Sequence, residues 1–266
     1  MSYIGVAALI YVVVAITACS AQRYALFPAP PGGRTPQLEG ATLHRIPGSN
    51  GATVYALHVP APEGAPTLVH FHGNGEDLAD VASLAREVRV AGLGVYAVEY
   101  PGYGLARGSE ASEQAIYAAA EKALAHLYGV IGVLRADIIL QGQSLGSGVA
   151  VEMALRGHGR RLVLLSPYTS ITEVASRLAP FLPASLLVRD RFDSRTKAPR
   201  VTQPVLILHG SADDLIPPQM GRTLGGLFPS ATVEILEGAH HNDLFAQEPP
   251  IVGRIVQFAL AGPGAR

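Results

Sequence analysis

Short runs of aliphatic and β-branched residues alternate with longer amphipathic stretches along most of this chain. The runs that predict buried strands are Thr67 to Phe71, Gly94 to Val98, Asp137 to Leu140, Arg161 to Leu165, Pro204 to Leu208 and Thr232 to Leu236. Apolar residues at three- and four-residue spacing predict helices over Leu78 to Val90, Ala111 to Tyr128, Leu145 to Leu155, Pro218 to Leu227 and Pro250 to Leu260. Strands that alternate with helices pair in parallel, and we expect the helices to cover both faces of the sheet.

Two earlier runs, Ala41 to Pro47 and Ala52 to Val59, predict an antiparallel hairpin across Ser49-Asn50-Gly51. The expected α/β fold therefore has a mostly parallel eight-stranded sheet. Hydrophobic residues make up 48% of the 266 residues and charged residues only 15%, which excludes an intrinsically disordered chain. This length favours one domain with a short appendage.

Charge and cysteine content exclude several kinds of function. The formal net charge is -1 and no basic block is present, so we expect no nucleic-acid partner. The chain holds one cysteine, which excludes an intramolecular disulfide framework and a multi-cysteine zinc site.

The N-terminus predicts a segment directed to a membrane. Residues 3–18 carry no charge, and a helix from Met1 to Cys19 would be about 28 Å long, close to the thickness of a bilayer core. Ile16-Thr17-Ala18 before Cys19 resembles the lipobox of bacterial lipoproteins. The region before the apolar run has no Lys or Arg, which leaves an uncleaved anchor open. We therefore expect residues 1–22 to be a hydrophobic signal or membrane anchor and the protein to be associated with a membrane of the cell envelope.

Residues 27–40 are rich in Pro and Gly, a composition that cannot form a helix or a ladder, and we expect residues 23–40 to be a tether. No internal repeat follows, and residues 41–266 are expected to form the main domain.

The first candidate for a catalytic residue lies in the pentapeptide Gly142-Gln143-Ser144-Leu145-Gly146, between a predicted strand and a predicted helix. A nucleophile elbow needs this context, because its serine takes strained backbone angles and the glycines two residues away avoid clashes. The simpler interpretation is an ordinary glycine-rich turn. The strand–turn–helix context favours Ser144 as a nucleophile.

A second turn, His72-Gly73-Asn74, follows the strand ending at Phe71. The backbone amides of Asn74 and Leu145 are expected to face one point and to form an oxyanion hole. His70 and His72 share one face of a strand, which would also suit a metal site. No third ligand follows at a recognisable spacing, so buried, hydrogen-bonded histidines are the favoured interpretation.

The base and the residue that orients it are expected in two later loops. One loop contains Asp213 and Asp214, and the other contains His240 and His241. Each loop follows a predicted strand, so both lie at the sheet edge that carries Ser144, where open α/β sheets place their sites. The order Ser, acid, His is typical of one hydrolase fold.

With these residues in place, the chain resembles the α/β-hydrolase family over about residues 23–260. It is most similar to a small-cap, membrane-anchored subgroup that includes serine aminopeptidase-like and protein depalmitoylase-like enzymes. The segments that carry the resemblance are Arg23 to Pro28, His72-Gly73-Asn74, Glu99 to Gly104, the Ser144 elbow, Arg191-Phe192-Asp193-Ser194, His209-Gly210 with Asp213, and His241-Asn242-Asp243.

The resemblance selects among the candidates. It implies Asp213 rather than Asp214, because the family's acid lies three residues after the Gly of the His-Gly pair. It implies His241 rather than His240, because the family's histidine precedes Asn-Asp, although His240 stands where the family more often has Gly. The implied reaction is acyl transfer through Ser144, which needs no metal and no organic cofactor.

Substrate choice is open in the sequence. Fewer than forty residues separate the strand ending at Leu165 from the one starting at Pro204, which predicts a minimal cap with short helices at Ile171 to Leu182 and Leu186 to Arg189. An apolar site beside a membrane suits a small acyl ester or a lipidated substrate, cleaved at an ester or thioester bond. Two alternatives remain: a peptidase-like amide hydrolase, and an anchored scaffold that binds partners without catalysis.

Overall fold

The computed structural model describes residues 22–24, 26–30, 33–48, 52–247 and 250–261. The predicted apolar helix, its Cys19 and the hairpin turn at residues 49–51 lie outside these ranges. Within the described ranges, no helix combines the length and the apolar character needed to cross a bilayer.

One sheet forms the centre of the domain. Its strands are β1 (Thr42–Pro47), β2 (Thr53–Val59), β3 (Thr67–Phe71), β4 (Gly94–Val98), β5 (Ile138–Gln143), β6 (Arg161–Leu165), β7 (Val205–Gly210) and β8 (Ala231–Leu236). They lie in the order β1-β2-β4-β3-β5-β6-β7-β8, and the pairs β1·β2 and β2·β4 are antiparallel. The other pairs are parallel, which confirms the predicted mostly parallel eight-stranded sheet.

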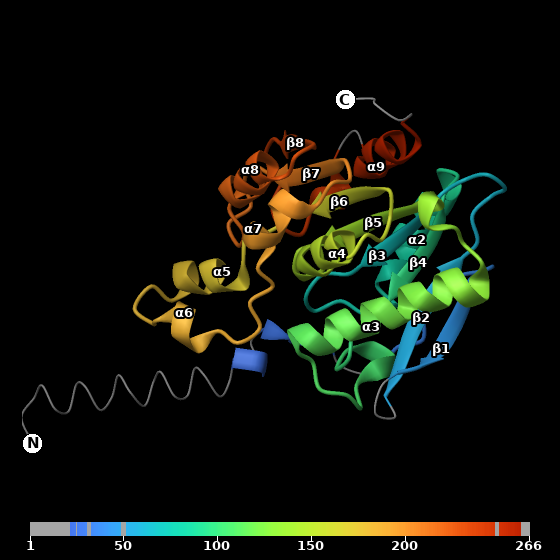
Figure 1. Ribbon diagram of the computed structural model, residues 1–266, viewed down its shortest axis with the longest axis horizontal. Helices are drawn as coiled ribbons and strands as arrows, with labels where there is room; N and C mark the ends of the chain where they lie inside the picture. Colours follow the sequence, from blue (N-terminus) through green and yellow to red (C-terminus); the bar gives the residue numbers. More distant parts are fainter. Residues whose placement is uncertain (1–21, 25, 31–32, 49–51, 248–249, 262–266) are drawn as a thin grey trace, which may run out of the picture.

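Helices cover both faces of this sheet (Figure 1). They are α2 (Val81–Val90), α3 (Glu113–His126), α4 (Leu145–Leu155), α8 (Pro218–Leu227) and α9 (Ile251–Leu260). Consecutive strand residues point to opposite faces. Leu68 of β3 therefore packs in the cluster with residues of α2 and α9, whereas its neighbour Val69 packs in the cluster with residues of α3, α4 and α8.

Some boundaries differ from the prediction for local reasons. Helix α3 begins at Glu113 because the Ser112 side chain accepts a hydrogen bond from the Ala115 amide at 3.2 Å, which caps the helix. Strand β5 continues past its predicted end at Leu140, since Gly142 still pairs with Phe71 of β3. The strand thus runs directly into the turn at Ser144.

The segment between β6 and β7 forms a small cap with helices α5 (Ile171–Leu178) and α6 (Ala184–Leu187). A further short helix, α7 (Ser194–Lys197), has no counterpart in the prediction; the Asp193 side chain caps it by accepting from the Thr196 amide at 3.2 Å. In Figure 1, α5 and α6 lie beside the blue N-terminal segment and away from β1.

Described residues of the predicted tether pack against the main domain. The Phe27 ring is buried edge-on against Phe192, with 6.3 Å between ring centroids. The Arg34 guanidinium donates to both carboxylate oxygens of Asp77, at 3.2 and 3.0 Å. The division of the chain at residue 40 stays a prediction.

Candidate active site

Ser144 occupies the turn between β5 and α4 with φ 48° and ψ -116°. This region is unfavourable for a residue with a side chain, and the surrounding structure must hold it there. The flanking glycines make the turn possible. A Cβ on Gly142 would overlap the backbone of Gly146, and a Cβ on Gly146 would overlap the carbonyl oxygen of Phe71. This is the backbone geometry of a nucleophile elbow.

Three side chains from separate loops meet at this turn. The Ser144 hydroxyl donates to Nε2 of His241 at 3.0 Å. Nδ1 of the same ring donates to Oδ2 of Asp213 at 2.7 Å. All three residues are at least nine-tenths buried. A serine, a histidine and a carboxylate in this arrangement can pass a proton from the hydroxyl to the imidazole while the carboxylate fixes the ring's tautomer.

The Asp213 carboxylate is held in its ionised form. Burial alone raises its pKa, but hydrogen bonds from His209, His241 and the Ile216 amide outweigh burial and lower the pKa well below the usual range. The Ile216 amide donates to Oδ1 at 2.8 Å and the Leu215 amide at 3.2 Å. Asp213 can therefore accept from His241 throughout the neutral pH range.

His209 contacts Asp213, a role that the sequence did not predict for it. Its Nε2 lies 3.4 Å from Oδ2 of Asp213 and 2.8 Å from the carbonyl oxygen of Ile216. His209 is buried and is the residue before Gly210, the last residue of β7, so its position next to the acid follows from the turn after that strand.

The structure separates the two adjacent histidines. His241 is buried against Ser144, whereas His240 is exposed and its amide donates to Oδ1 of Asp243 at 2.6 Å. Asp243 therefore stabilises the loop through this hydrogen bond. Asp214, the acid that the resemblance did not select, is exposed.

The residues expected to form the oxyanion hole lie on both sides of Ser144. Leu145 is the first residue of α4, and the first amides of a helix have no acceptor within that helix. Asn74 follows β3, whose last residue, Phe71, pairs with Gly142 of β5, so the two turns are neighbours at one edge of the sheet. The Tyr103 hydroxyl donates to Oδ1 of Asn74 at 2.7 Å, which fixes the Asn74 turn.

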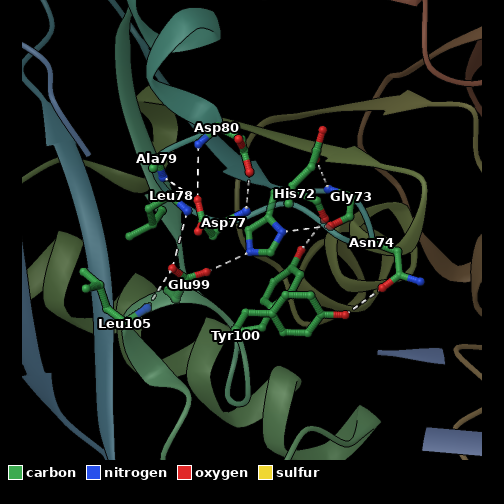
Figure 2. Close-up of polar contacts among 12 residues, drawn as sticks. His72, Gly73, Asn74, Asp77, Leu78, Ala79, Asp80, Glu99, Tyr100 and Leu105 are labelled. Carbon is green, nitrogen blue, oxygen red and sulfur yellow. Dashed lines mark hydrogen bonds and ion pairs between the residues drawn. The ribbon is translucent and has the colours of Figure 1, made fainter. Parts of the chain in front are cut away.

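A buried His–Glu pair supports the same turn. Nε2 of His72 lies 3.2 Å from Oε1 of Glu99, and Nδ1 lies 2.9 Å from the carbonyl oxygen of Gly73 (Figure 2). The Tyr100 ring stacks on the imidazole with 4.0 Å between centroids, and its hydroxyl donates to the carbonyl oxygen of His72 at 2.9 Å. Sequence reasoning did not pair His72 with Glu99, although both directly follow paired residues at the ends of β3 and β4.

The pKa values of His70 in β3 and of His72 just after it shift in opposite directions. Burial lowers the pKa of His72, but the hydrogen bond and charge of Glu99 outweigh burial and raise the pKa above its ordinary value. The neighbouring His70 has its pKa lowered to about 3 by burial and by His72, so its ring is neutral. Its Nδ1 lies 3.3 Å from Oε1 of Gln141. Both rings thus have protein partners.

Replacing Glu99 with Gln is expected to destabilise the fold in a pH-dependent way. The raised pKa means that protonated His72 favours the folded state; this contribution is complete below about pH 6.5, the ordinary histidine value, and is lost as pH rises through the higher folded pKa. Glu99→Gln should therefore lower the free energy of unfolding by about 1–3 kcal/mol at pH 6 and by less at pH 8.5, measured by urea unfolding.

The matched control for this substitution is Glu63→Gln, which removes the charge of an exposed glutamate in the turn before β3 and should leave the free energy of unfolding unchanged. Glu76 and His70 also face His72, and both residues are unchanged in the two variants. An equal loss of stability at pH 6 and pH 8.5 would contradict a charged His72–Glu99 pair.

Comparison with known proteins gives matches of both sequence and structure. A family model described as serine aminopeptidase, S33, matches residues 62–192. An α/β hydrolase domain-containing protein 17C from Xenopus laevis is 33% identical over 232 residues, covering 84% of this chain and 70% of that protein. An uncharacterized protein of Mycobacterium tuberculosis is 35% identical over 190 residues, covering 71% of this chain and 67% of that protein.

The human protein 17C is 35% identical over 207 residues, and the matched region spans 59% of its length. Among solved structures, a Paleococcus ferrophilus monoacylglycerol lipase matches with a TM-score of 0.58 and 23% identity, over 77% of this chain and 98% of that one. An esterase of Pyrococcus furiosus matches with a TM-score of 0.68 and 14% identity, over 86% of this chain and 97% of that one. At these identities the two structures share a fold with this chain.

Proposed function

The chain belongs to the α/β-hydrolase family, and from that premise we propose that it is a membrane-attached serine hydrolase that cleaves carboxylic ester or thioester bonds. The observation that carries the proposal is the pair of hydrogen bonds from Ser144 to His241, 3.0 Å, and from His241 to Asp213, 2.7 Å. The serine stands on a strained elbow at the carboxyl end of β5, where the fold places a nucleophile.

The first half of the reaction forms an acyl-enzyme. Ser144 Oγ attacks the carbonyl carbon while Nε2 of His241 takes the hydroxyl proton, and Asp213 stabilises the imidazolium that results. The amides of Asn74 and Leu145 donate to the oxyanion of the tetrahedral intermediate. When that intermediate collapses, the bond to the alcohol or thiol breaks and His241 gives its proton to the leaving group.

The second half releases the acid. A water molecule gives a proton to His241 and attacks the acyl carbon, and the second tetrahedral intermediate collapses with return of a proton to Ser144 Oγ. Asp213 stays ionised in both halves of the reaction, since its hydrogen bonds lower its pKa well below neutral pH. The cycle uses water as its only co-reactant.

We take an apolar cavity in the cap as the candidate site for the acyl group, which favours acyl esters over peptides. A cavity of about 350 Å³ lies between α5, α6 and the N-terminal segment. Its described lining is apolar except for Gln22, and it includes no Asp or Glu that would bind the α-ammonium group of a peptide. The family model's description as a serine aminopeptidase keeps amide hydrolysis as the second candidate.

Acyl esters and thioesters of graded chain length, assayed beside aminoacyl anilides, test the proposal. We expect turnover of the esters and thioesters to exceed that of the anilides. Anilide turnover that exceeds ester turnover would assign the peptidase reaction instead. A chain that turns over none of them would favour the non-catalytic scaffold.

Membrane attachment is proposed from residues 3–18, which carry no charge, and it predicts that the full chain stays with membranes after a high-salt wash. Salt screens electrostatic binding, but it does not release an inserted helix or an acyl anchor, whose hold is apolar burial of about 0.8 kcal/mol per methylene. Full-length protein recovered in the soluble fraction without detergent would contradict attachment.

Cys19 separates the two forms of attachment. A lipoprotein would have a mature chain that begins at an acylated Cys19, and Cys19→Ala would block its processing. An uncleaved anchor would keep Met1, and Cys19→Ala would change nothing. Intact-mass spectrometry of the wild type and of the Cys19→Ala variant distinguishes these outcomes.

A further inference from the structure

The cap carries a group of large apolar side chains that face solvent. Leu178 on α5 is 65% exposed, Phe181 in the following turn is 66% exposed and Leu186 on α6 is 82% exposed. Tyr24, in the adjoining N-terminal segment, is 85% exposed. Isolated exposed apolar residues are normal, whereas several on one projecting element mark an interaction surface. We call Leu178, Phe181 and Leu186 the cap patch.

The cap patch continues into an apolar cavity. Leu178 both faces solvent and lines the cavity of about 350 Å³ between α5, α6 and the N-terminal segment. Val174, Ala175 and Leu187 line the same cavity. Apolar surface is thus present both outside and immediately inside the cap.

The start of the described chain is bound to this same cap. The Gln22 side chain donates to the carbonyl oxygen of Leu187 at 3.1 Å and accepts from the Arg189 amide at 3.0 Å. The apolar residues 3–18 come shortly before Gln22 in the sequence. A membrane segment made by these residues would therefore end beside α6, and the cap would be the part of the domain held closest to the bilayer.

We propose that the cap patch is a membrane-docking surface that inserts Leu178, Phe181 and Leu186 among the lipid acyl chains. Interfacial segments bury apolar side chains about 5–10 Å into the boundary between headgroups and acyl chains. Arg177 is exposed next to Leu178 on α5, where its guanidinium can reach lipid phosphates while its stem lies along apolar surface. This docking is a second membrane contact, separate from the N-terminal segment, and it does not depend on catalysis by Ser144.

The absence of tryptophan from the chain allows a direct test. Phe181→Trp and Leu186→Trp each place one fluorophore in the cap patch. Val130→Trp is the matched control, since Val130 is an apolar residue 72% exposed after α3 and outside the cap. Each full-length variant is reconstituted into phosphatidylcholine–phosphatidylglycerol vesicles with brominated acyl chains. All three variants keep the same N-terminal segment.

On vesicles, the tryptophans in the cap patch should emit at shorter wavelength than in solution. Brominated acyl chains should quench their fluorescence at least roughly twofold more strongly than that of Val130→Trp, as insertion to acyl-chain depth requires. Equal quenching of cap and control variants would overturn the proposal. A blue shift without quenching by bromine would also overturn it, because residues 3–18 or a second copy would then cover the patch. Ester turnover of each variant is measured separately, so failure of docking and failure of the hydrolase proposal are distinguishable.

Discussion

Ser144→Ala is expected to reduce hydrolysis of p-nitrophenyl esters by several orders of magnitude. The substitution removes the oxygen that forms the acyl-enzyme and that lies 3.0 Å from Nε2 of His241. The folded structure should persist, because the elbow's backbone and its flanking glycines are unchanged. Initial rates and circular dichroism spectra of wild type and variant measure these two expectations.

Ser176→Ala is the matched control for this prediction. Ser176 lies on α5, where its hydroxyl donates to the carbonyl oxygen of Thr172 at 2.9 Å, far in the chain from the elbow. Its loss should leave turnover close to that of the wild type. Turnover near the wild-type rate in Ser144→Ala would exclude Ser144 as the nucleophile.

The second large effect is expected at His241. His241→Ala removes the proton acceptor of Ser144 and should lower kcat by several orders of magnitude. His240→Ala should lower kcat by about tenfold or less, because the His240 side chain is exposed and the loop is held through its backbone amide, which the variant keeps.

The two histidine variants control for one another, since they change adjacent residues of one loop. Steady-state kinetics on the same ester, with circular dichroism to check folding, give the ranking. A larger loss in His240→Ala than in His241→Ala would show that the loop in solution presents the other histidine to Ser144.

Most of the fold could be predicted from the regular spacing of apolar residues. The strand and helix patterns from Thr67 onward predicted the sheet because parallel strands are buried on both faces and their apolar runs are continuous. Helix starts were less predictable. Helix α2 begins at Val81 rather than Leu78, because the Asp77 carboxylate accepts from the Ala79 and Asp80 amides and holds a turn before the helix.

The site was predictable where strands end and ambiguous within loops. The Ser144 turn could be located because its strand and helix are both regular. In the loop after β8 no periodicity distinguishes His240 from His241. Which of the two rings faces Ser144 depends on the hydrogen bond that Asp243 accepts from the His240 amide and on which ring is buried. The His72–Glu99 pair was missed because it depends on the register of β3 with β4, which a single sequence does not provide.

Labelling with a fluorophosphonate shows whether Ser144 is an activated nucleophile, because this reagent forms a covalent bond with an activated serine and with few other residues. The full-length protein is labelled in detergent, digested and analysed by mass spectrometry, with heat-denatured protein as the control. We expect one adduct, on the peptide that contains Ser144, and we expect it to be lost after denaturation or in His241→Ala. An unlabelled native protein, or an adduct on another serine with Ser144 unmodified, would contradict the assignment of Ser144 as the nucleophile of a serine hydrolase.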